Sequence, residues 1–501
     1  MEIFNVSMFL ISFLLLLFLN VKRFARRADP KLPRGPWKLP IIGSIHHLVG
    51  SLPHRSLRDL STKHGPLMLL KLGEVNTLVV SSPEGAREIM KTHDITFANR
   101  PMLVGIKIST YGGKDLVFAP YGDYWRELRK MCVLELLSFK RVQSFRSIRE
   151  EEVFNLIRSI SSMNNNGSSL VNLTKKLFML TNDIIMRAAI GNKCKDQNAL
   201  LVALTEMAHL SGGFDLADLF PSSFLASLIS RVAPKMKMYH EKVDRILDDI
   251  IRDHLERKKA SLVEEDLLDV LLRVHEEGGL PFALTMDAVK AVTLDMLAGG
   301  SESAFSTLDW AMAELMRNPE VMKKAQSEVR EVLGREVKVT EGEITELNYL
   351  KLVLKETLRL HPPIPLLVPR ECREKVEVLG YEIPEKTRVI VNVWALGRDP
   401  KIWDDAEEFK PERFDGSKID FKGTNFEYLP FGAGRRMCPG ITFGLANMEL
   451  ALACLLYYYN WELADGMLPG DMDMAESSGV AARRKSELCL RAIPYISCPM
   501  E

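Results

Sequence analysis

The chain has 501 residues and is neutral overall, with 66 basic and 66 acidic side chains. Hydrophobic residues make up 47% and charged residues 26%, an ordinary globular composition that excludes a disordered chain. Without a basic excess, a nucleic-acid-binding protein is not expected. The seven cysteines are scattered and form no C-x-x-C pair, which argues against a disulfide scaffold or zinc ribbon and fits a reducing compartment.

The N-terminus is predicted to hold a membrane anchor. Residues 3–19 are almost wholly apolar, and four basic residues follow between positions 22 and 27. A cleaved signal peptide is the alternative, but Glu2 stands where a basic charge is expected and no A-x-A-like cleavage site follows. We therefore expect a transmembrane signal anchor at 1–21 and a basic stop with a proline-rich spacer at 22–43. Because basic residues stay on the cytoplasmic side, the body would face the cytosol.

Residues 44–501 show no break in composition and no repeat, so one large domain is predicted. Residues 67–73 and 77–81 have the pattern of a β-hairpin, and 376–393 form a second β region. Helical spacing of apolar residues dominates elsewhere, so the fold class is mainly α with a minor β part (α+β). The predicted helices are 125–158, 171–190, 198–210, 236–259, 263–276, 285–317, 319–333, 345–361 and 441–459.

The predicted helix 285–317 contains a local irregularity. It begins at Thr285, a good N-cap, ends before Asn318-Pro319 and is apolar around most of its surface, as expected for a helix inside a large domain. Its centre nevertheless reads Ala298-Gly-Gly-Ser-Glu-Ser303. Each glycine costs a helix about 1 kcal/mol relative to alanine, and a buried acid costs more unless it is paired. The pattern indicates either a functional site or a kink where another segment packs closely.

Cys438 stands in the loop Phe431-Gly-Ala-Gly-Arg-Arg-Met-Cys-Pro-Gly440, directly before a helical run from Ile441. Glycines allow a close backbone approach, and the basic pair and the helix N-terminus both favour a thiolate over a thiol. A thiolate in this setting is a good soft-metal ligand. The loop is not a dinucleotide-binding fingerprint, which would need glycine at Met437. The other six cysteines are interpreted as small hydrophobic residues.

The pattern F-x-x-G-x-R-x-C-x-G at 431–440 resembles the haem-binding loop of the cytochrome P-450 superfamily. Further landmarks of that superfamily occur in the expected order: W-x-x-x-R at 125–129, the oxygen-activation segment at 298–303, E-x-x-R at 356–359 and P-E-R-F at 411–414. The resemblance covers essentially the whole chain, and segments such as Phe-Gly-Ala-Gly-Arg-Arg and Leu-Val-Pro-Arg-Glu make it similar to plant microsomal members of the 71-type clan. It implies the cytochrome P-450 fold, a single large haem domain at 44–501 behind an N-terminal transmembrane helix.

The same resemblance implies haem b as the cofactor, with the Cys438 thiolate as the axial iron ligand, which favours O–O cleavage. The cofactor-binding residues would be Trp125, Arg129, Arg370, Phe431, Arg436 and Gly440. Arginine suits the haem propionates because it forms paired hydrogen bonds to carboxylates. Glu356, Arg359 and Arg413 would form a buried structural ion network, in which loss of one partner costs about 3–5 kcal/mol.

Glu302 and Ser303 would be the catalytic acid–alcohol pair that relays protons for oxygen activation. The family usually has threonine at position 303; serine keeps the hydroxyl, has a less fixed rotamer and could also bond back to the Gly299 carbonyl. The substrate-binding residues implied by the resemblance are Phe118, Ala298, Gly299, Ile364, Leu367 and Val480. They are apolar and would suit a lipophile. The segment 220–229 would either lie on the membrane and admit such substrates or pack internally.

The resemblance implies a haem-thiolate monooxygenase of the endoplasmic reticulum membrane, single-pass, with its catalytic domain in the cytosol. It would hydroxylate a lipophilic plant specialised metabolite, a terpenoid in preference to an alkaloid, phenolic or steroid, using O2. The chain lacks a credible dinucleotide fingerprint or P-loop, so NADPH electrons are expected from a separate NADPH-cytochrome reductase. A reductase-independent isomerase or dehydratase is an alternative, as is a non-catalytic haem sensor. The other partners would be membrane lipid and the substrate, with no nucleic acid.

Overall fold

The computed structural model describes residues 31–163, 170–194, 196–258, 265–334, 338–464 and 466–496. The predicted anchor at 1–21 and the basic stop up to residue 30 therefore lie outside the described residues.

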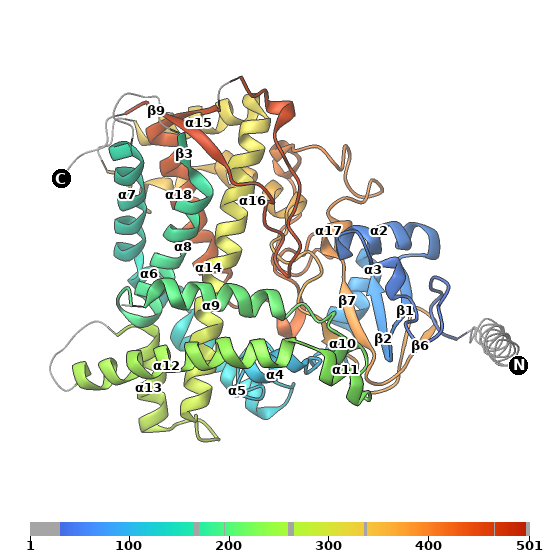
Figure 1. The fold of residues 1–501 in the computed structure, drawn as a ribbon. Helices are drawn as coiled ribbons and strands as arrows, with labels where there is room; N and C mark the ends of the chain where they lie inside the picture. Colours follow the sequence, from blue (N-terminus) through green and yellow to red (C-terminus); the bar gives the residue numbers. More distant parts are fainter. Residues whose placement is uncertain are drawn as a thin grey trace, which may run out of the picture.

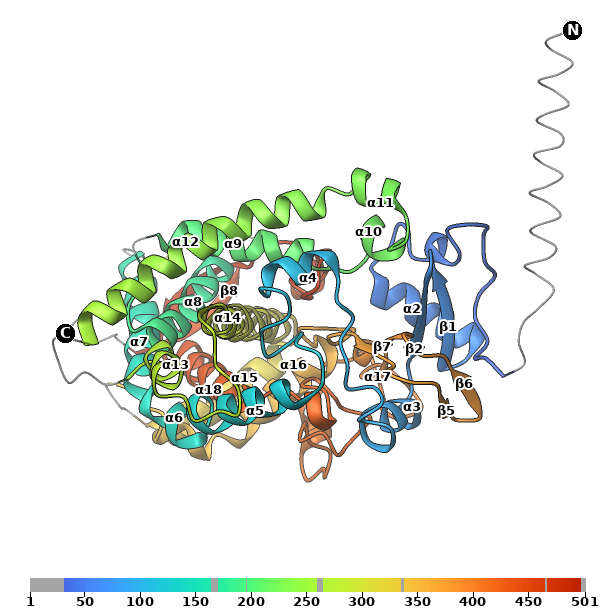
Figure 2. The ribbon, with the colours of Figure 1, turned by 90° about the horizontal axis from the view of Figure 1, so that it is seen from below.

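A helical bundle surrounds α14 (Met286–Arg317), which runs through its middle (Figures 1 and 2). The Thr285 hydroxyl accepts a hydrogen bond from the Ala288 backbone N–H at 3.3 Å, and the helix ends before Asn318, as predicted. It packs against α8 (Leu173–Ile190), α13 (Leu267–Glu277), α16 (Asn348–Leu360) and α18 (Ile441–Tyr458). Burial on almost every side explains why its sequence lacks a polar face.

The other helices follow in chain order and complete the mainly α architecture. They are α2 (Pro53–His64), α3 (Pro83–Arg87), α4 (Val104–Ser109), α5 (Asp123–Met131), α6 (Phe139–Ser144), α7 (Arg146–Met163), α9 (Gln197–Leu210), α10 (Leu216–Leu219), α11 (Phe224–Ile229), α12 (Val232–Lys258), α15 (Pro319–Leu333) and α17 (Val393–Leu396). α18 is long and apolar enough to cross a membrane, but most of it is buried in the protein. It is therefore a core helix.

The main β-sheet stands to one side of the bundle (Figure 1). Its order is β1-β2-β7-β4, and only the β2–β7 pair is parallel, with Leu78 opposite Val389. The strands are β1 (Leu67–Leu72), β2 (Val75–Val80), β4 (Arg370–Glu371) and β7 (Arg388–Val391). A second sheet has the order β3-β9-β8, and β5 pairs with β6 as a hairpin. These strands are β3 (Leu170–Asn172), β5 (Val376–Val378), β6 (Tyr381–Ile383), β8 (Tyr459–Leu463) and β9 (Cys489–Pro494). The prediction of a mainly α fold with a minor β part is confirmed.

Two local predictions need correction. The single helix expected at 125–158 is wrong: it divides into α5, a π-helical turn at Cys132–Leu136, α6 and α7. Ser138 starts a new helix by accepting a hydrogen bond from the Arg141 backbone N–H at 3.4 Å, a capping role that its polar side chain favours. In the predicted hairpin at 67–81, the turn lies at Gly73-Glu74, with Gly73 at φ +60°, and the second strand begins earlier than expected.

Candidate active site

Cys438 lies in the loop that leads into α18. Its backbone N–H donates to the Phe431 carbonyl oxygen at 3.0 Å, which folds residues 431–438 back on themselves. Gly434 has φ +70°, and a Cβ at this position would collide with the Met90 carbonyl oxygen. Glycine is therefore needed for both the conformation and the close approach. The loop is fixed against the rest of the protein and presents Cys438 just before the first turn of α18.

The Cys438 side chain has open space beside it, although protein atoms surround it closely enough to desolvate it. Desolvation raises the pKa of the thiol, while the Gly440 backbone N–H and the positive charge of Arg129 act in the opposite direction. Arg436, which the sequence placed among the groups favouring a thiolate, directs its guanidinium to the Ala98 carbonyl oxygen at 2.8 Å instead. A bound metal cation would deprotonate such a thiol outright.

Four arginines converge next to this loop, three of them deeply buried: Arg100, Arg370 and Arg436, joined by the half-buried Arg129. Desolvation, and then the charges of Arg436 and Arg370, hold the pKa of Arg100 well below its usual range. Desolvation, and then Arg370, lowers the pKa of Arg436 to about 9. Arg129 donates to the Met437 carbonyl oxygen at 2.6 Å, which ties this cluster directly to the cysteine loop.

Two carboxylates offset only part of this charge. Asp94 forms an ion pair with Arg370 at 3.0 Å, and Arg370 also donates to the Ala433 carbonyl oxygen at 2.7 Å. Asp115 raises the pKa values of Arg100 and Arg436, but one of its oxygens is buried without a hydrogen-bond partner. Four guanidinium groups thus face two carboxylates, and buried charges require partners. The cluster is chemically suited to an anionic ligand.

Trp125 packs within this cluster. Its indole N–H donates to the Leu116 carbonyl oxygen at 2.9 Å, and the Arg436 guanidinium lies 4.1 Å from its ring centroid. Arg436 also donates to the Ala119 carbonyl oxygen at 2.6 Å. Trp125 and Arg436 therefore brace residues 116–119, the segment that carries the predicted pocket residue Phe118.

The structure shows different roles for Gly299 and Gly300, the two glycines at the centre of α14. A Cβ on Gly300 would lie 2.8 Å from Cδ1 of Ile185, so this glycine permits close packing against α8. A Cβ on Gly299 would meet no atom within 4 Å, and both Ala298 and Gly299 are exposed although most of the helix is buried. One glycine serves packing, and the other is exposed together with Ala298.

Asp295 connects this part of α14 to the arginine cluster. Its carboxylate accepts hydrogen bonds from the backbone N–H groups of Leu116 at 2.7 Å and Val117 at 3.3 Å. Desolvation, and then the charge of Asp115, raises the pKa of Asp295 well above its usual range. The cysteine loop, the arginine cluster, residues 115–119 and the open side of α14 are thereby joined by direct contacts into one site.

The two predicted catalytic side chains have definite partners. The Ser303 hydroxyl donates to the Gly299 carbonyl oxygen at 2.8 Å, the back-bond that the sequence predicted as one option. Both carboxylate oxygens of Glu302 are held by Arg483, through Nε and a terminal nitrogen of its guanidinium. Glu302, the predicted acid, therefore binds Arg483 and not Ser303.

The predicted pocket residues all retain accessible surface. Ala298, Gly299 and Val480 are exposed, and Phe118, Ile364 and Leu367 are half-buried. Two of the segments that carry them are joined, because the Ala482 backbone N–H donates to the Pro363 carbonyl oxygen at 2.9 Å. Leu367 also approaches the cysteine loop, since its Cδ1 would lie 3.7 Å from a Cβ on Gly432.

The structure places Glu356, Arg359 and Arg413 in one ion network. Arg359 donates to both Glu356 oxygens at 2.7 Å, and Arg413 Nε donates to Glu356 Oε1 at 2.9 Å. The Glu356 and Arg359 side chains are fully buried. Arg359 also donates to the Ala406 carbonyl oxygen at 2.7 Å, so the network fixes the segment before Pro411–Phe414 to α16.

Comparison with known proteins decides the family. The sequence model of the cytochrome P-450 family matches residues 33–490. This chain belongs to the cytochrome P-450 family. Desmethyl-deoxy-podophyllotoxin synthase of Sinopodophyllum hexandrum is 55% identical over 97% of this chain and 96% of its own length. Premnaspirodiene oxygenase of Hyoscyamus muticus is 53% identical over 98% of each chain.

A relative named as a 71D member of the cytochrome P-450 family, from Solanum chacoense, is 52% identical over 98% of this chain and 99% of its own. This agrees with the plant 71-type clan inferred from the sequence. A solved zebra fish cytochrome P-450 with progesterone superposes with a TM-score of 0.75 at 25% identity, covering 89% of this chain and all of the other. The protein is thus a cytochrome P-450 monooxygenase with haem as its cofactor.

The residues of the cytochrome P-450 site fit haem. Haem b carries two propionates, which suit the positive charge of the arginine cluster. The accessible thiol of Cys438 lies beside that cluster through Arg129. All four arginines of the cluster have partners within the protein: Arg370 pairs with Asp94, and Arg100, Arg129 and Arg436 donate to backbone carbonyl oxygens.

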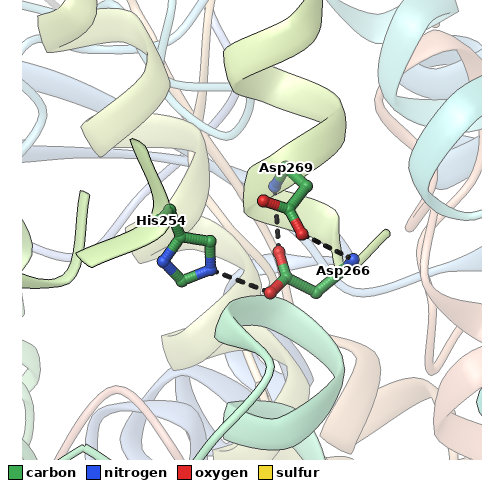
Figure 3. Close-up of side chains that lie close together, drawn as sticks. All are labelled: His254, Asp266 and Asp269. Atoms are coloured by element: carbon green, nitrogen blue, oxygen red, sulfur yellow. Dashed lines mark hydrogen bonds and ion pairs between the residues drawn. The ribbon is translucent and has the colours of Figure 1, made fainter. Parts of the chain in front are cut away.

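Another cluster of potential metal ligands lies away from this site and has a structural explanation (Figure 3). His254 Nε2 lies 2.8 Å from Asp266 Oδ2, and the other ring nitrogen lies 2.8 Å from the Ile250 carbonyl oxygen. Asp266 and Asp269 form a reciprocal capping box at the start of α13. The three side chains therefore join α12 to the N-terminus of α13, and their ligand atoms are already used.

Several residues of the site were not identified from the sequence, and three of them show why. Arg100 is a single basic residue in Phe97-Ala-Asn-Arg-Pro101, and nothing local marks its burial. Asp295 is an acid in an apolar helix, so the buried-charge argument used for Glu302 could have found it. Arg483 lies in a polar stretch, Ala481-Ala-Arg-Arg-Lys485, where its partner is 181 positions away.

Proposed function

We propose that this cytochrome P-450 is a membrane-anchored enzyme that hydroxylates a terpenoid, with O2 and with electrons from a separate NADPH-cytochrome reductase. The observation that carries the proposal is the open, apolar side of α14 at Ala298 and Gly299, next to the cysteine loop and the arginine cluster. Small apolar side chains at the reaction centre leave room for a bulky lipophile and offer it no charged group. Premnaspirodiene oxygenase, a relative named for a terpenoid, supports this class.

A phenolic substrate is the second candidate. The relative with 55% identity is named for a lignan, desmethyl-deoxy-podophyllotoxin. A lignan is also lipophilic, and a change of about 1–3 kcal/mol in an apolar pocket is enough to exchange one such substrate for another.

We propose the following roles for the site residues. Cys438 would bind the haem iron, within a loop shaped by Phe431 and Gly440, and Arg436, Arg129 and Arg100 would bind the propionates. Trp125 and Arg370, which pack within this cluster, would complete the haem-binding set. When bound, haem supplies the centre at which O2 is activated and one oxygen atom is passed to the substrate.

Ser303 is proposed to hold and transfer a proton at the open side of α14. Its Oγ–H now points to the Gly299 carbonyl oxygen, and rotation about χ1 would redirect it, which serine permits more readily than threonine. Glu302 would supply protons to that hydroxyl through water when its carboxylate is not fully engaged by Arg483. Phe118, Ile364, Leu367 and Val480 would line the pocket with Ala298 and Gly299.

The membrane proposal combines the apolar N-terminus with an exposed apolar surface. Four large side chains of α11 are 64–77% exposed: Phe224, Leu225, Leu228 and Ile229. Of the two options for residues 220–229, lipid contact is therefore favoured over internal packing for α11, because exposed apolar groups in this number mark an interaction surface. With an anchor at 1–21 and a basic stop after it, the proposed location is the endoplasmic reticulum membrane, with the domain in the cytosol.

The test is turnover in microsomes that contain the full chain and an NADPH-cytochrome reductase. A panel of terpenoids, lignans, alkaloids and steroids would be offered with NADPH and isotopically labelled O2. We expect an NADPH-dependent product from a terpenoid that carries one labelled oxygen atom. A labelled product from lignans alone would replace the terpenoid proposal with the second candidate. Conversion of hydroperoxides without NADPH, and no labelled product, would replace it with the isomerase or dehydratase.

A further inference from the structure

Three side chains at four-residue intervals on α14 hold two other segments of the chain. They are Ser306, Trp310 and Glu314, and residues at this spacing lie on the same side of a helix. The Ser306 hydroxyl and the Trp310 indole N–H both donate to the Ala482 carbonyl oxygen, at 3.0 Å and 2.7 Å. Glu314 Oε1 lies 2.7 Å from Nε2 of His361, the residue directly after α16. This face of α14 therefore contacts both the end of α16 and the segment around Ala482.

Trp310, the middle residue of the three, touches both segments itself. Its ring is fully buried and stacks on the His361 ring, with 3.9 Å between the centroids and 5° between the planes. Its indole N–H at the same time binds Ala482. The two segments are also bonded to each other, because the Ala482 backbone N–H donates to the Pro363 carbonyl oxygen at 2.9 Å. These contacts form a closed set around one indole ring.

A stiff stretch of chain connects His361 to the predicted pocket residue Ile364. Pro362 and Pro363 lie between them, and a proline ring fixes the backbone angle φ. The His361 backbone N–H donates to the Thr357 carbonyl oxygen at 2.7 Å, which fixes the start of this stretch to the last turn of α16. The position of Ile364 therefore follows that of His361.

A tight hairpin connects Ala482 to the predicted pocket residue Val480, two positions earlier. The hairpin is closed by a hydrogen bond from the Ser477 backbone N–H to the Arg483 carbonyl oxygen at 2.8 Å. The Arg483 side chain is bound in turn by Glu302. Because Ala482 stands between these contacts and Val480, the bonds that hold Ala482 also fix where Val480 lies.

We propose that Trp310 is a positioning residue that sets the separation between the two pocket walls at Ile364 and Val480. The inference rests on the pocket roles proposed for these two residues. The ring face of Trp310 holds the wall that follows α16, and its N–H holds the hairpin wall with help from Ser306. The width of the pocket, and with it the size of the lipophile that the enzyme accepts, then depends on a fully buried side chain of α14.

Two ligands of haem iron that differ in size test the proposal in the haem-loaded protein. They are imidazole and N-tritylimidazole, which carries three phenyl rings, and each Kd is measured from the shift of the Soret band. Trp310→Phe keeps a flat ring against His361 but removes the N–H, and Ser306→Ala removes the second donor to Ala482. Each should lower the Kd of N-tritylimidazole by about twofold or more, as for loss of a neutral hydrogen bond, and the double variant by about tenfold. The Kd of imidazole should stay the same, because this small ligand does not need the space between the walls.

Trp461→Phe is the matched control. Trp461 is also buried, and its indole N–H donates to the Leu455 carbonyl oxygen at 2.9 Å, but it lies on β8 in the second sheet. This variant should leave both Kd values unchanged. The ratio of the two Kd values cancels any loss of folded protein, so a merely structural role of Trp310 would leave the ratio at its wild-type value.

Two reference variants separate the proposal from the pocket assignment on which it rests. Ile364→Ala and Val480→Ala widen the pocket directly, and both should lower the Kd of N-tritylimidazole. If they do, while the ratio stays at the wild-type value in Trp310→Phe, Ser306→Ala and the double variant, the role of Trp310 is overturned. If neither reference variant changes the ratio, the proposed pocket fails, and the inference fails with it. Ser306→Ala decides the matter if Trp310→Phe does not fold.

Discussion

Replacing Glu356 by glutamine removes the negative charge from the buried ion network and keeps the size of the side chain. Glu356 Oε1 accepts hydrogen bonds from Arg359 at 2.7 Å, the Lys410 backbone N–H at 2.8 Å and Arg413 at 2.9 Å, and Oε2 accepts one from Arg359 at 2.7 Å. The glutamine amide can replace only part of these acceptors. Arg359, which has no exposed side-chain surface, would keep its charge without a carboxylate.

An uncompensated buried charge of this kind costs about 3–5 kcal/mol. Folded domains have free energies of unfolding of only about 5–15 kcal/mol, so Glu356→Gln should lose a large part of the total. The measurement is urea-induced unfolding of the purified protein at neutral pH, followed by tryptophan fluorescence and by haem absorbance. The unfolding midpoint should fall with little change in its slope.

Glu412→Gln is the matched control in the neighbouring segment. Glu412 pairs with Lys324, and the two side chains are 45% and 60% exposed. An exposed pair contributes about 0–1 kcal/mol, so this variant should unfold close to the wild type. If Glu356→Gln were also within about 1 kcal/mol of the wild type, the argument from buried charge would be refuted.

Three further predictions concern haem binding, oxygen use and pH. Arg100→Gln should weaken haem binding by about tenfold or more in titrations of the haem-free protein, as for loss of a charged hydrogen bond; unchanged affinity would remove Arg100 from the propionate site. Ser303→Ala should divert NADPH electrons from product to hydrogen peroxide, whereas Ser303→Thr should not; equal product yields in both would exclude the hydroxyl relay. Glu476 has a pKa of about 2, because the hydrogen bond and charge of His54, with Arg55, outweigh the opposing effect of burial. The stability that the ionised Glu476 contributes should be lost as the pH falls from about 4.5 towards 2, so the stability difference between wild type and Glu476→Gln should narrow in that range.

Much of the fold and the core of the site could be predicted because they depend on local sequence. α14 was predicted to within one residue, since its cap at Thr285 and its stop at Asn318-Pro319 are local signals. The Cys438 loop was found for the same reason: glycines, a basic pair and a following helix are contiguous. The break of the helix at 125–158 was missed because apolar spacing continues through it, while the cap at Ser138 is a single residue.

The tertiary pairings could not be predicted in the same way. Glu302 was interpreted as a relay acid from its position alone, and its binding to Arg483 depends on a hairpin that is remote in sequence. The arginine cluster likewise joins Arg100, Arg129, Arg370 and Arg436 from four separate segments. Burial and charge balance, which show that this cluster needs an anion, exist only once the chain is folded.

The central claim is that Cys438 is the thiolate ligand of haem, and spectroscopy of Cys438→Ser tests it most directly. The reduced wild-type protein with carbon monoxide should show the red-shifted Soret band of a thiolate-ligated haem. A hydroxyl cannot supply the same electron density to the iron, so Cys438→Ser should lose that band and either bind haem with an ordinary spectrum or fail to retain it. If Cys438→Ser kept the same red-shifted band as the wild type, the ligand assignment and the site built on it would be contradicted.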